Sequence, residues 1–204
     1  MGRRYSKICK LLGHTVYDAD SLRPEKIIPN DFDAVILATP TKYHLDVINS
    51  YKIYEKPMLV EKPLYTTAEG HRLFEAGWFP KKLVRMINQY EYYLADTFEK
   101  ETRVWPKEHT RTSKVTHYNY FKSGGDSIAW DCINVVGLAD LDSDIELAND
   151  SLVWDCAING RHLDIEKMDL AYIWNILDWT QKFDSNYDYI VHVHNRVFEL
   201  LGEK

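Results

Sequence analysis

Two short apolar runs, each followed by a proline-containing turn, most constrain what this chain folds into. Residues 34–38 read Ala-Val-Ile-Leu-Ala and precede Thr39-Pro40, while residues 58–60 read Met-Leu-Val and precede Glu61-Lys62-Pro63. Continuous apolar runs of this kind are typical of parallel strands that are buried on both faces. We therefore expect a parallel sheet whose strands alternate with helices, as in a doubly wound α/β fold.

A helix and two more strands are predicted on either side of these runs. The first helix starts almost at residue 1 and ends at Gly13, because five apolar residues have helical spacing: Tyr5, Ile8, Cys9, Leu11 and Leu12. Residues 15–17 and 83–87 are predicted strands, the latter closing the sheet.

Two further helices are predicted within the first half of the chain. Residues 43–51 have helical spacing, and Thr66 and Glu69 match a capping box that marks a helix start. The sequence thus predicts a reduced Rossmann-like lobe over residues 1–88.

From about residue 88 the pattern changes to that of a small α+β lobe. Residues 115–121 alternate like a strand, and residues 128–139 are predicted to be a helix. Residues 153–158 and 161–163 flank Asn159-Gly160, a typical hairpin turn. We expect residues 89–204 to form a second lobe with an antiparallel sheet, packed rigidly on the first because no flexible linker separates them.

Two helices are predicted to close the chain. Over residues 169–181 we expect three apolar side chains to face inward: Ile173, Trp174 and Leu177. Over residues 189–201 the inward set is Val193, Val197 and Leu200. His192 and His194 are two apart and so lie on different helical faces, which favours a surface pair.

Composition excludes several classes of function. The net charge is −6 with a pI near 5.7, and the 25 Lys and Arg residues are scattered, which argues against nucleic acid as a partner. Three cysteines without Cys-x-x-Cys spacing predict neither a disulfide framework nor a metal site. No apolar run has the roughly 20 residues of a membrane span, so we expect a cytoplasmic protein without a membrane partner.

Three segments of the first 90 residues share their order and spacing with a known family. Residues 2–16 look like the last glycine of a dinucleotide loop, its helix and the second strand. Residues 33–44, DAVILATPTKYH, look like a strand, a Thr-Pro turn and a histidine that line the nicotinamide. Residues 56–70, KPMLVEKPLYTTAEG, look like a Glu-Lys-Pro segment, and VRMINQY resembles the next strand with its Asn88. Together they resemble the Gfo/Idh/MocA oxidoreductases.

This resemblance implies a Rossmann lobe with an open sheet lobe, NAD or NADP as cofactor, and hydride transfer at a sugar, polyol or sugar-nucleotide carbon. It places Lys62 near the reacting hydroxyl, where a cation holds the substrate oxygen and stabilises developing charge. It also implies a homodimer through the second lobe. The cofactor-binding residues that it implies are Gly2, Asp18, Asp20, Thr39, Pro40, His44 and Glu61.

The sequence departs from the family pattern in three places. Of the Gly-x-Gly-x-x-Gly fingerprint only Gly2 is present, so either the start lies upstream or the pyrophosphate cradle is missing. The stretch between Asp20 and Asp31 is too short for helix, strand and helix, which predicts a small sheet. If Asp131 is the catalytic motif's aspartate, the motif's histidine falls on Val135, which cannot transfer a proton.

Each of these residues also has a plainer interpretation. Lys62 is then a turn lysine, His44 makes a local hydrogen bond, and acids such as Asp18 merely follow a strand. The repeated Trp-Asp-Cys at residues 130–132 and 154–156 is expected to pack between the lobes rather than bind metal.

Two functions follow from these observations. The first is an oxidoreductase that acts on a sugar or sugar nucleotide. The second is a catalytically inactive relative that keeps the scaffold to bind a nucleotide or a protein partner. Such pared-down chains resemble small reading frames of tailed phages, so a phage origin is part of the second hypothesis.

Overall fold

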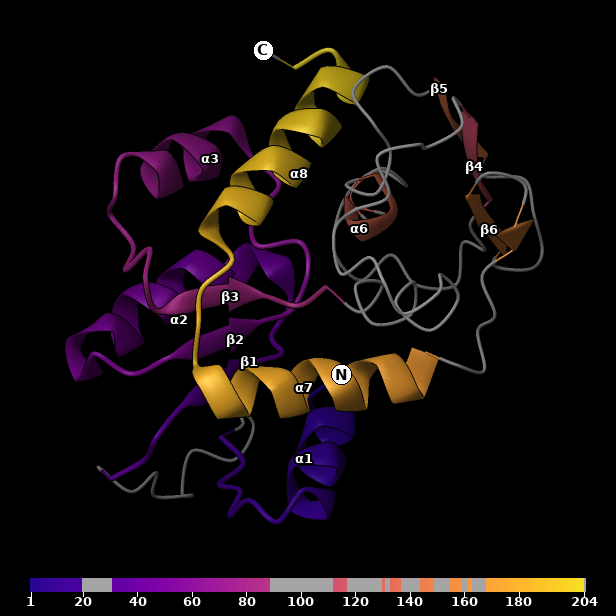
Figure 1. The fold of residues 1–204 in the computed structure, drawn as a ribbon. Helices are drawn as coiled ribbons and strands as arrows, with labels where there is room; N and C mark the ends of the chain where they lie inside the picture. Colours follow the sequence, from indigo (N-terminus) through magenta and orange to yellow (C-terminus); the bar gives the residue numbers. More distant parts are fainter. Residues whose placement is uncertain are drawn as a thin grey trace.

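A three-stranded parallel sheet forms the centre of the first half of the chain (Figure 1). The computed structural model describes residues 1–19, 31–88, 112–116, 130, 133–136, 144–148, 155–158, 161–162 and 168–203. The strands are β1 (Val35–Leu37), β2 (Met58–Val60) and β3 (Val84–Met86), paired in that order. The expected small parallel sheet is confirmed.

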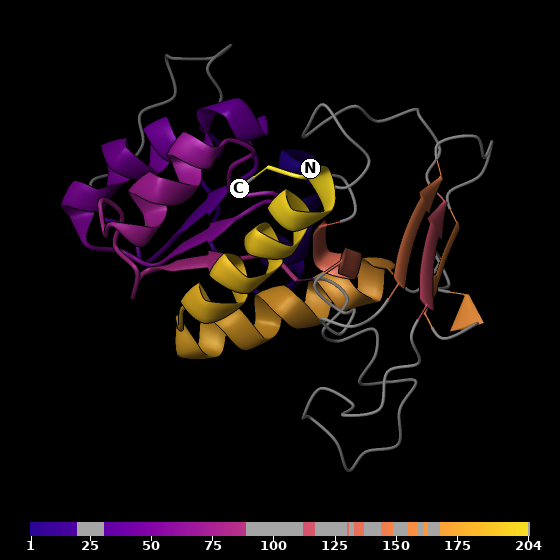
Figure 2. The same cartoon turned by 90° about the horizontal axis from the view of Figure 1, so that it is seen from above.

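Helices cover both faces of this sheet (Figures 1 and 2). They are α1 (Gly2–Leu11), α2 (His44–Tyr51) with short 3-10 turns at Thr41–Tyr43 and Lys52–Tyr54, α3 (Ala68–Glu75), α7 (Met168–Lys182) and α8 (Tyr187–Leu201). Side chains of α2, α3 and α8 share one apolar cluster with the sheet, and those of α1 and α7 share the other. The sheet is therefore a buried middle layer, as its apolar strands predict.

The strand register decides which residues face which helices. Ile36 is paired with Leu59, and Leu59 with Arg85. Ile36 and Leu59 pack in the cluster formed with α1 and α7, while Arg85 bonds Asp178 of α7. Because side chains alternate along a strand, the flanking residues of each strand face the opposite cluster.

The first helix ends as predicted, but the strand expected after it does not form. Gly13 has a φ of +88° and follows the last turn, where its N–H bonds Lys10 O and the N–H of His14 bonds Cys9 O. Residues 15–17 have no strand structure. Val16 instead packs partly buried against the cluster around α1. Among the described residues no strand pairs with the outer side of β1, so residues 15–17 do not extend the sheet there.

Helix α3 forms where it was expected, but a different residue caps it. The N-cap is Thr67, whose hydroxyl oxygen accepts the Gly70 N–H at 3.1 Å. Thr66 is therefore not the cap. Glu69 pairs with Arg72 instead of closing a capping box.

The second sheet has the strand order β5–β4–β6–β7. Its strands are β4 (Thr112–Thr116), β5 (Asp144–Ala148), β6 (Asp155–Ile158) and β7 (Arg161–His162), with helix α6 (Ile133–Val136) between β4 and β5 in the chain. Pairs β4–β6 and β6–β7 are antiparallel, but β4–β5 is parallel, so the sheet is mixed rather than purely antiparallel. A long connection that contains a helix permits such parallel pairing.

The antiparallel pairing expected for the hairpin is confirmed by its register, in which Ile158 of β6 is opposite Arg161 of β7. Residues 117–121, 131–132 and 154 lie outside the described residues, and so does most of the helix expected over residues 128–139. Figure 2 shows α6 between the two sheets. Trp130, beside α6, is buried and packs on His194 and Phe198 of α8.

Helix α7 was predicted correctly, and Ile173 and Leu177 are partly buried as expected, but Trp174 is not. Trp174 is 49% exposed, and Asn175, Ile176 and Trp179 are buried instead. The Asn175 amide nitrogen donates to the main chain, at 2.8 Å from Asn88 O, whereas its buried Oδ1 has no hydrogen-bond partner among the described residues. A polar residue is therefore buried next to an exposed tryptophan.

On α8, Val193 and Val197 are buried as expected, while Leu200 is 39% exposed and His194 is completely buried. The predicted surface pair is wrong for His194. Its Nδ1 lies 2.7 Å from Ile190 O, and its ring lies 4.0 Å from the ring of Tyr65. These contacts satisfy an imidazole inside the core.

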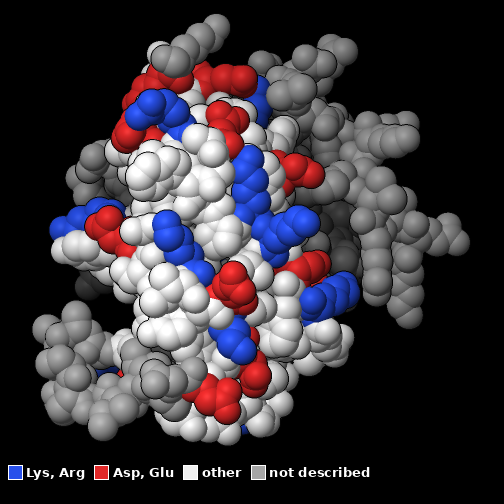
Figure 3. All heavy atoms as spheres, turned by 90° about the vertical axis from the view of Figure 1, so that its left-hand side faces the viewer, with Lys and Arg blue, Asp and Glu red and all other residues white. Residues whose placement is uncertain are grey.

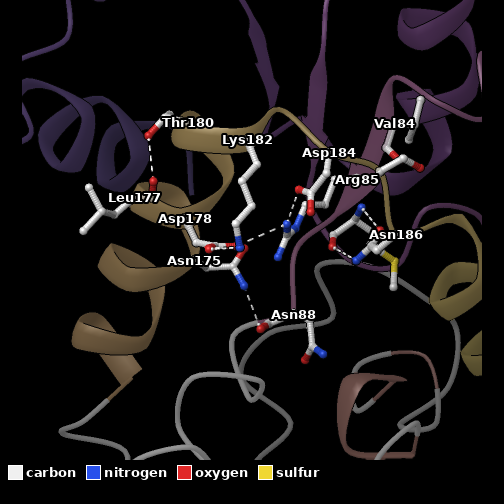
Figure 4. Close-up of polar contacts among 12 residues, drawn as sticks. Val84, Arg85, Asn88, Asn175, Leu177, Asp178, Thr180, Lys182, Asp184 and Asn186 are labelled. Carbon is white, nitrogen blue, oxygen red and sulfur yellow. Dashed lines mark hydrogen bonds and ion pairs between the residues drawn. The ribbon is translucent and has the colours of Figure 1, made fainter. Parts of the chain in front are cut away.

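The connection between α7 and α8 is tied to β3 by polar side chains (Figure 4). The buried guanidinium of Arg85 forms ion pairs with Asp178 and Asp184. Asn186 accepts the Met86 N–H at 2.9 Å and donates to Met86 O at 2.8 Å. The Asn186 amide thus satisfies the edge of β3 as a neighbouring strand would.

Within the described residues, no helix is both long and apolar enough to span a bilayer. Figure 3 shows Lys and Arg side chains interspersed with Asp and Glu on the face at the left of Figure 1. This face therefore offers no broad surface of one charge.

Candidate functional site

The carboxyl ends of the three parallel strands meet at one edge of the sheet. Their last paired residues are Leu37, Val60 and Met86. Pairing continues one residue further, because the Glu61 N–H bonds Leu37 O and the Ile87 N–H bonds Val60 O, both at 2.9 Å. Ligands of open α/β sheets bind outside this edge.

Just beyond the last hydrogen bonds of the sheet, three polar residues occupy neighbouring positions. They are Thr39, Lys62 and Asn88, each two residues after the last paired residue of its strand. Neighbouring strands are about 4.8 Å apart, so these residues occupy adjacent positions on the edge. Thr39 is exposed, Lys62 is partly exposed and Asn88 is buried.

The two Glu-Lys-Pro tripeptides flank β2 at opposite ends. Lys56 precedes the strand at the amino edge, where Pro57 O accepts the Val35 N–H. Lys62 follows it at the carboxyl edge, before a cis peptide bond to Pro63. Only Lys62 therefore belongs to the ligand-binding edge, although the two lysines have the same immediate neighbours in the sequence.

A buried carboxylate holds the main chain at Lys62. Glu61 is 6% exposed, and its Oε2 accepts the Lys62 N–H at 3.0 Å. Its Oε1 accepts the hydroxyl of Tyr5, on α1, at 2.6 Å. Burial, with a further effect of Glu61, raises the pKa of Tyr5 well above its usual value, so the hydroxyl is the donor. Both Glu61 oxygens thus have protein partners, and Glu61 acts as a support for Lys62.

Arg4 and Tyr172 continue this contact towards α7. The ring of Tyr172 meets that of Tyr5 edge to face, with centroids 5.9 Å apart. The Arg4 guanidinium lies 5.1 Å from the Tyr172 ring centroid, a cation–π distance. Helices α1 and α7 are therefore joined beside the carboxyl edge.

His44 connects the segments that follow β1 and β2. It is completely buried, and its ring nitrogens lie 2.8 Å from Thr39 O and 2.9 Å from Pro63 O. Burial lowers the pKa of His44, which the two carbonyl contacts partly oppose. A buried ring between two carbonyls fixes the spacing of the two segments. This placement matches the plainer interpretation of His44, a local hydrogen-bonding role.

The other residues implied by the resemblance are more scattered. Gly2 and Pro40 are exposed, and a Cβ added to Gly2 would meet Ala38 Cβ at 3.9 Å, so α1 begins close to the end of β1. Asp18 is exposed on a segment without strand structure. Asp20 and Asp131 lie outside the described residues. Among the described residues, no group of three or more His, Cys, Asp and Glu could hold a metal ion.

Sequence reasoning missed Tyr5, Asn134 and Asn175 as parts of this site. Asn134 donates to Ile87 O at 3.0 Å, and Asn175 donates to the next carbonyl, that of Asn88. Both asparagines are almost fully buried. The available signal was a lone asparagine within an apolar helical stretch, since such a residue needs a specific partner in the core.

Comparison with known proteins shows which fold this chain shares. No family model and no curated protein matches the sequence. Among solved structures, the WlbA (WbpB) dehydrogenase from Thermus thermophilus, in complex with NAD and UDP-GlcNAcA, superposes with a TM-score of 0.66. The match has 13% identity and covers 97% of this chain and 90% of that chain.

Two other dehydrogenase structures give similar matches. UDP-N-acetylglucosamine 3-dehydrogenase GnnA from Acidithiobacillus ferrooxidans has a TM-score of 0.57 and 13% identity, covering 99% of this chain and 86% of that chain. A Gfo/Idh/MocA family oxidoreductase from Vibrio cholerae has a TM-score of 0.55 and 11% identity, covering 81% and 75%. The chain has the Gfo/Idh/MocA fold. The resemblance seen in residues 2–90 is thereby confirmed at the level of fold.

Proposed function

We propose that this protein is an NAD- or NADP-dependent oxidoreductase that acts on a sugar, polyol or sugar nucleotide. The observation that carries the proposal is the strand register, which brings Thr39, Lys62 and Asn88 to one level at the carboxyl edge. Open α/β sheets bind their ligands there. The same fold in a dehydrogenase complexed with NAD and UDP-GlcNAcA supports this choice of cofactor and substrate class.

The residues near the edge fit an anionic dinucleotide. Helix α1 begins at Gly2, has no acidic residue in its first turn, and carries the exposed Arg3 and Arg4 there. A helix N-terminus with added positive charge attracts phosphates. The nearest side chain to a Cβ added at Gly2 is Ala38, at an ordinary contact distance, so the backbone of this turn is open to approach. Gly2, Arg3 and Arg4 would hold the phosphates, and Thr39 would lie near the nicotinamide.

When bound, the nicotinamide supplies the hydride that is exchanged with a substrate carbon. Lys62 then acts on the oxygen of that carbon. In the direction of reduction its ammonium stabilises the negative charge that develops on the carbonyl oxygen and donates the proton that completes the alcohol. In oxidation, the reverse step, the same hydroxyl proton would return to Nζ of Lys62. If Asp131 is the motif's aspartate, the motif's histidine position is Val135, which cannot take this role.

The supports of Lys62 suit this function because they act on its main chain from both sides. Glu61 accepts the Lys62 N–H, and His44 bonds the carbonyl of Pro63. A lysine whose backbone is fixed loses less freedom when its ammonium binds a substrate oxygen.

Calorimetric titration with NADH and NADPH, followed by turnover assays with UDP-N-acetylglucosamine, tests the proposal. We expect saturable cofactor binding in the micromolar range and turnover that Lys62→Met abolishes. Lys56→Met is a matched control, because it changes the same tripeptide at the opposite edge and should leave turnover unchanged. No binding at millimolar cofactor, or equal turnover in both variants, would refute the proposal.

A second candidate is a catalytically inactive relative that binds a nucleotide or a protein partner. The observation in its favour is that both oxygens of Glu61 and both ring nitrogens of His44 face protein atoms at hydrogen-bond distance. This candidate predicts saturable nucleotide binding without turnover, and the same binding in Lys62→Met.

The homodimer expected through the second lobe remains a proposal. Sedimentation velocity of the whole chain tests it, since a dimer of this 24.0 kDa chain has twice the mass of a monomer. A monomer at every concentration up to about 100 μM would exclude any dimer with a micromolar dissociation constant.

A further inference from the structure

Three buried asparagines meet at the carboxyl end of β3. Asn88 is the residue at the edge, Asn134 comes from α6 and Asn175 from α7, and they are 2%, 1% and 0% exposed. Three primary amides in one part of a core need an explanation, because each carries donors and an acceptor that must be satisfied when water is excluded.

Two of the three amides donate to the main chain of β3, although Asn175 Oδ1, like Asn88 Oδ1, has no hydrogen-bond partner among the described residues. The Asn134 amide donates to Ile87 O at 3.0 Å and accepts the hydroxyl of Tyr189 at 2.9 Å. The Asn175 amide donates to Asn88 O at 2.8 Å. These bonds hold two successive carbonyls at the strand end, one from each flanking helix, and so fix where Asn88 points.

The third amide, that of Asn88, differs from the other two because it lies at the carboxyl edge of the sheet. Asn88 Oδ1 is buried and has no hydrogen-bond partner among the residues that the structure describes. Figure 4 shows the Asn88 side chain directed away from Asn175, while its main-chain oxygen faces Asn175. A buried acceptor without a donor destabilises the protein, so its retention suggests that another molecule supplies the donor.

The position of this oxygen indicates which molecule that is. Asn88 lies at the register level of Lys62, on the adjacent strand of the carboxyl edge. A carboxamide oxygen accepts hydrogen bonds and repels anions, so it fits an O–H or N–H donor and not a phosphate.

We propose that Asn88 is a ligand-binding residue whose Oδ1 accepts a hydrogen bond from an O–H or N–H group of the molecule bound beside Lys62. Asn134 and Asn175 are positioning residues that hold the Asn88 main chain. The donor is either a sugar hydroxyl of the substrate or the carboxamide N–H of a nicotinamide. This inference rests on the proposed function for the identity of the ligand, but not for the role of the unpaired oxygen.

The test uses Asn88→Leu, which keeps the branched shape and the number of side-chain heavy atoms but removes the oxygen. Asn195→Leu, which changes an exposed asparagine of α8, is the control. NADH and UDP-N-acetylglucosamine are titrated separately by calorimetry, and thermal unfolding is measured without ligand. We expect Asn88→Leu to weaken one probe about 10- to 100-fold, as loss of a specific hydrogen bond does. The probe that is weakened identifies the source of the donor. Unchanged binding of both probes would overturn the proposal.

The ligand-free measurement gives a separate answer. If Asn88 serves a ligand, Asn88→Leu removes an unsatisfied buried amide, and its Tm should equal or exceed that of the wild type. A clear fall in Tm, or a failure to fold, means that Asn88 has a structural partner, and overturns the proposal.

Asn88→Ala covers the case in which Leu is not tolerated, because it also removes the oxygen and adds neither bulk nor charge. We expect it to weaken the same probe about 10- to 100-fold; unchanged binding of both probes by this variant would contradict the proposal. If the wild type binds neither probe, the proposed function fails, while the Tm of Asn88→Leu still decides the role of Asn88.

Discussion

The hydroxyl of Tyr5 lies 2.6 Å from Oε1 of Glu61, a residue 56 positions further along the chain. This contact joins the first helix to the segment that follows β2. Because the second oxygen of Glu61 accepts the Lys62 N–H, the position of Lys62 depends on how α1 packs against the sheet.

Tyr5→Phe tests the energetic importance of this contact. It leaves a buried carboxylate oxygen without its donor, so the free energy of unfolding should fall by about 1–3 kcal/mol. Urea denaturation measures the change. Tyr17→Phe is the control, because Tyr17 is 57% exposed and its hydroxyl is open to water. Equal stability of the two variants would show that water replaces the lost donor.

Asn186→Ala should weaken the edge of β3. The substitution removes the amide that bonds both the N–H and the C=O of Met86. We therefore expect the free energy of unfolding to fall by about 1–3 kcal/mol. Hydrogen exchange of the Met86 amide should also become faster, which reports on this site directly. Asn49→Ala, at an exposed position of α2, is the matched control. Unchanged protection of Met86 in Asn186→Ala would contradict the role given to this side chain.

The ion pairs of Arg85 lead to a third prediction. Asp184→Asn removes one of the two carboxylates that face the buried guanidinium. We expect the free energy of unfolding to fall by about 1–2 kcal/mol. This is less than for a fully buried ion pair, because Asp184 is 47% exposed and solvent screens its charge. Chemical denaturation measures the stability of Asp184→Asn and compares it with that of Asp33→Asn, a control at an exposed position. A loss no larger than in the control would mean that Asp178 alone satisfies Arg85.

The sequence was sufficient for those parts of the fold that depend on continuous apolar runs. Strand β2 is fully buried, and such a run has few alternatives to a central parallel strand. The strand expected at residues 15–17 failed because a strand needs a neighbour, which local sequence does not reveal. Trp174 was placed inward because the large aromatic ring outweighed Asn175 in a hydrophobic pattern, whereas the structure buries Asn175 through its bond to Asn88 O.

In the candidate site, too, positions set by local sequence could be predicted, whereas contacts between distant segments could not. Lys62 and Thr39 could be placed at the carboxyl edge from strand ends alone, because parallel strands end on one side. The contacts of Tyr5 with Glu61 and of His44 with Pro63 could not, since they depend on how elements distant in the sequence pack together.

The last prediction concerns pH and rests on His194. Burial lowers the pKa of this histidine from 6.5 to about 3, and Nδ1 bonds Ile190 O in the neutral form. The unfolded chain therefore binds a proton more readily than the folded protein does. Stability that is complete above about pH 6.5 should be lost as the pH falls towards 3. At pH 5 the loss from His194 amounts to about 2 kcal/mol relative to pH 8.

Urea denaturation of His194→Phe between pH 8 and pH 5 measures this contribution. Phe keeps a ring against Tyr65 but cannot bind a proton, so the variant should lose less stability on acidification, although it starts from a lower value because the bond to Ile190 O is gone. The pKa of His44 is also lowered by burial, so part of the acid sensitivity should remain in this variant. His192→Gln, two residues away and exposed, should keep the full pH dependence. If His194→Phe has the same pH dependence as the wild type, His194 is not the buried neutral residue that makes the fold sensitive to acid.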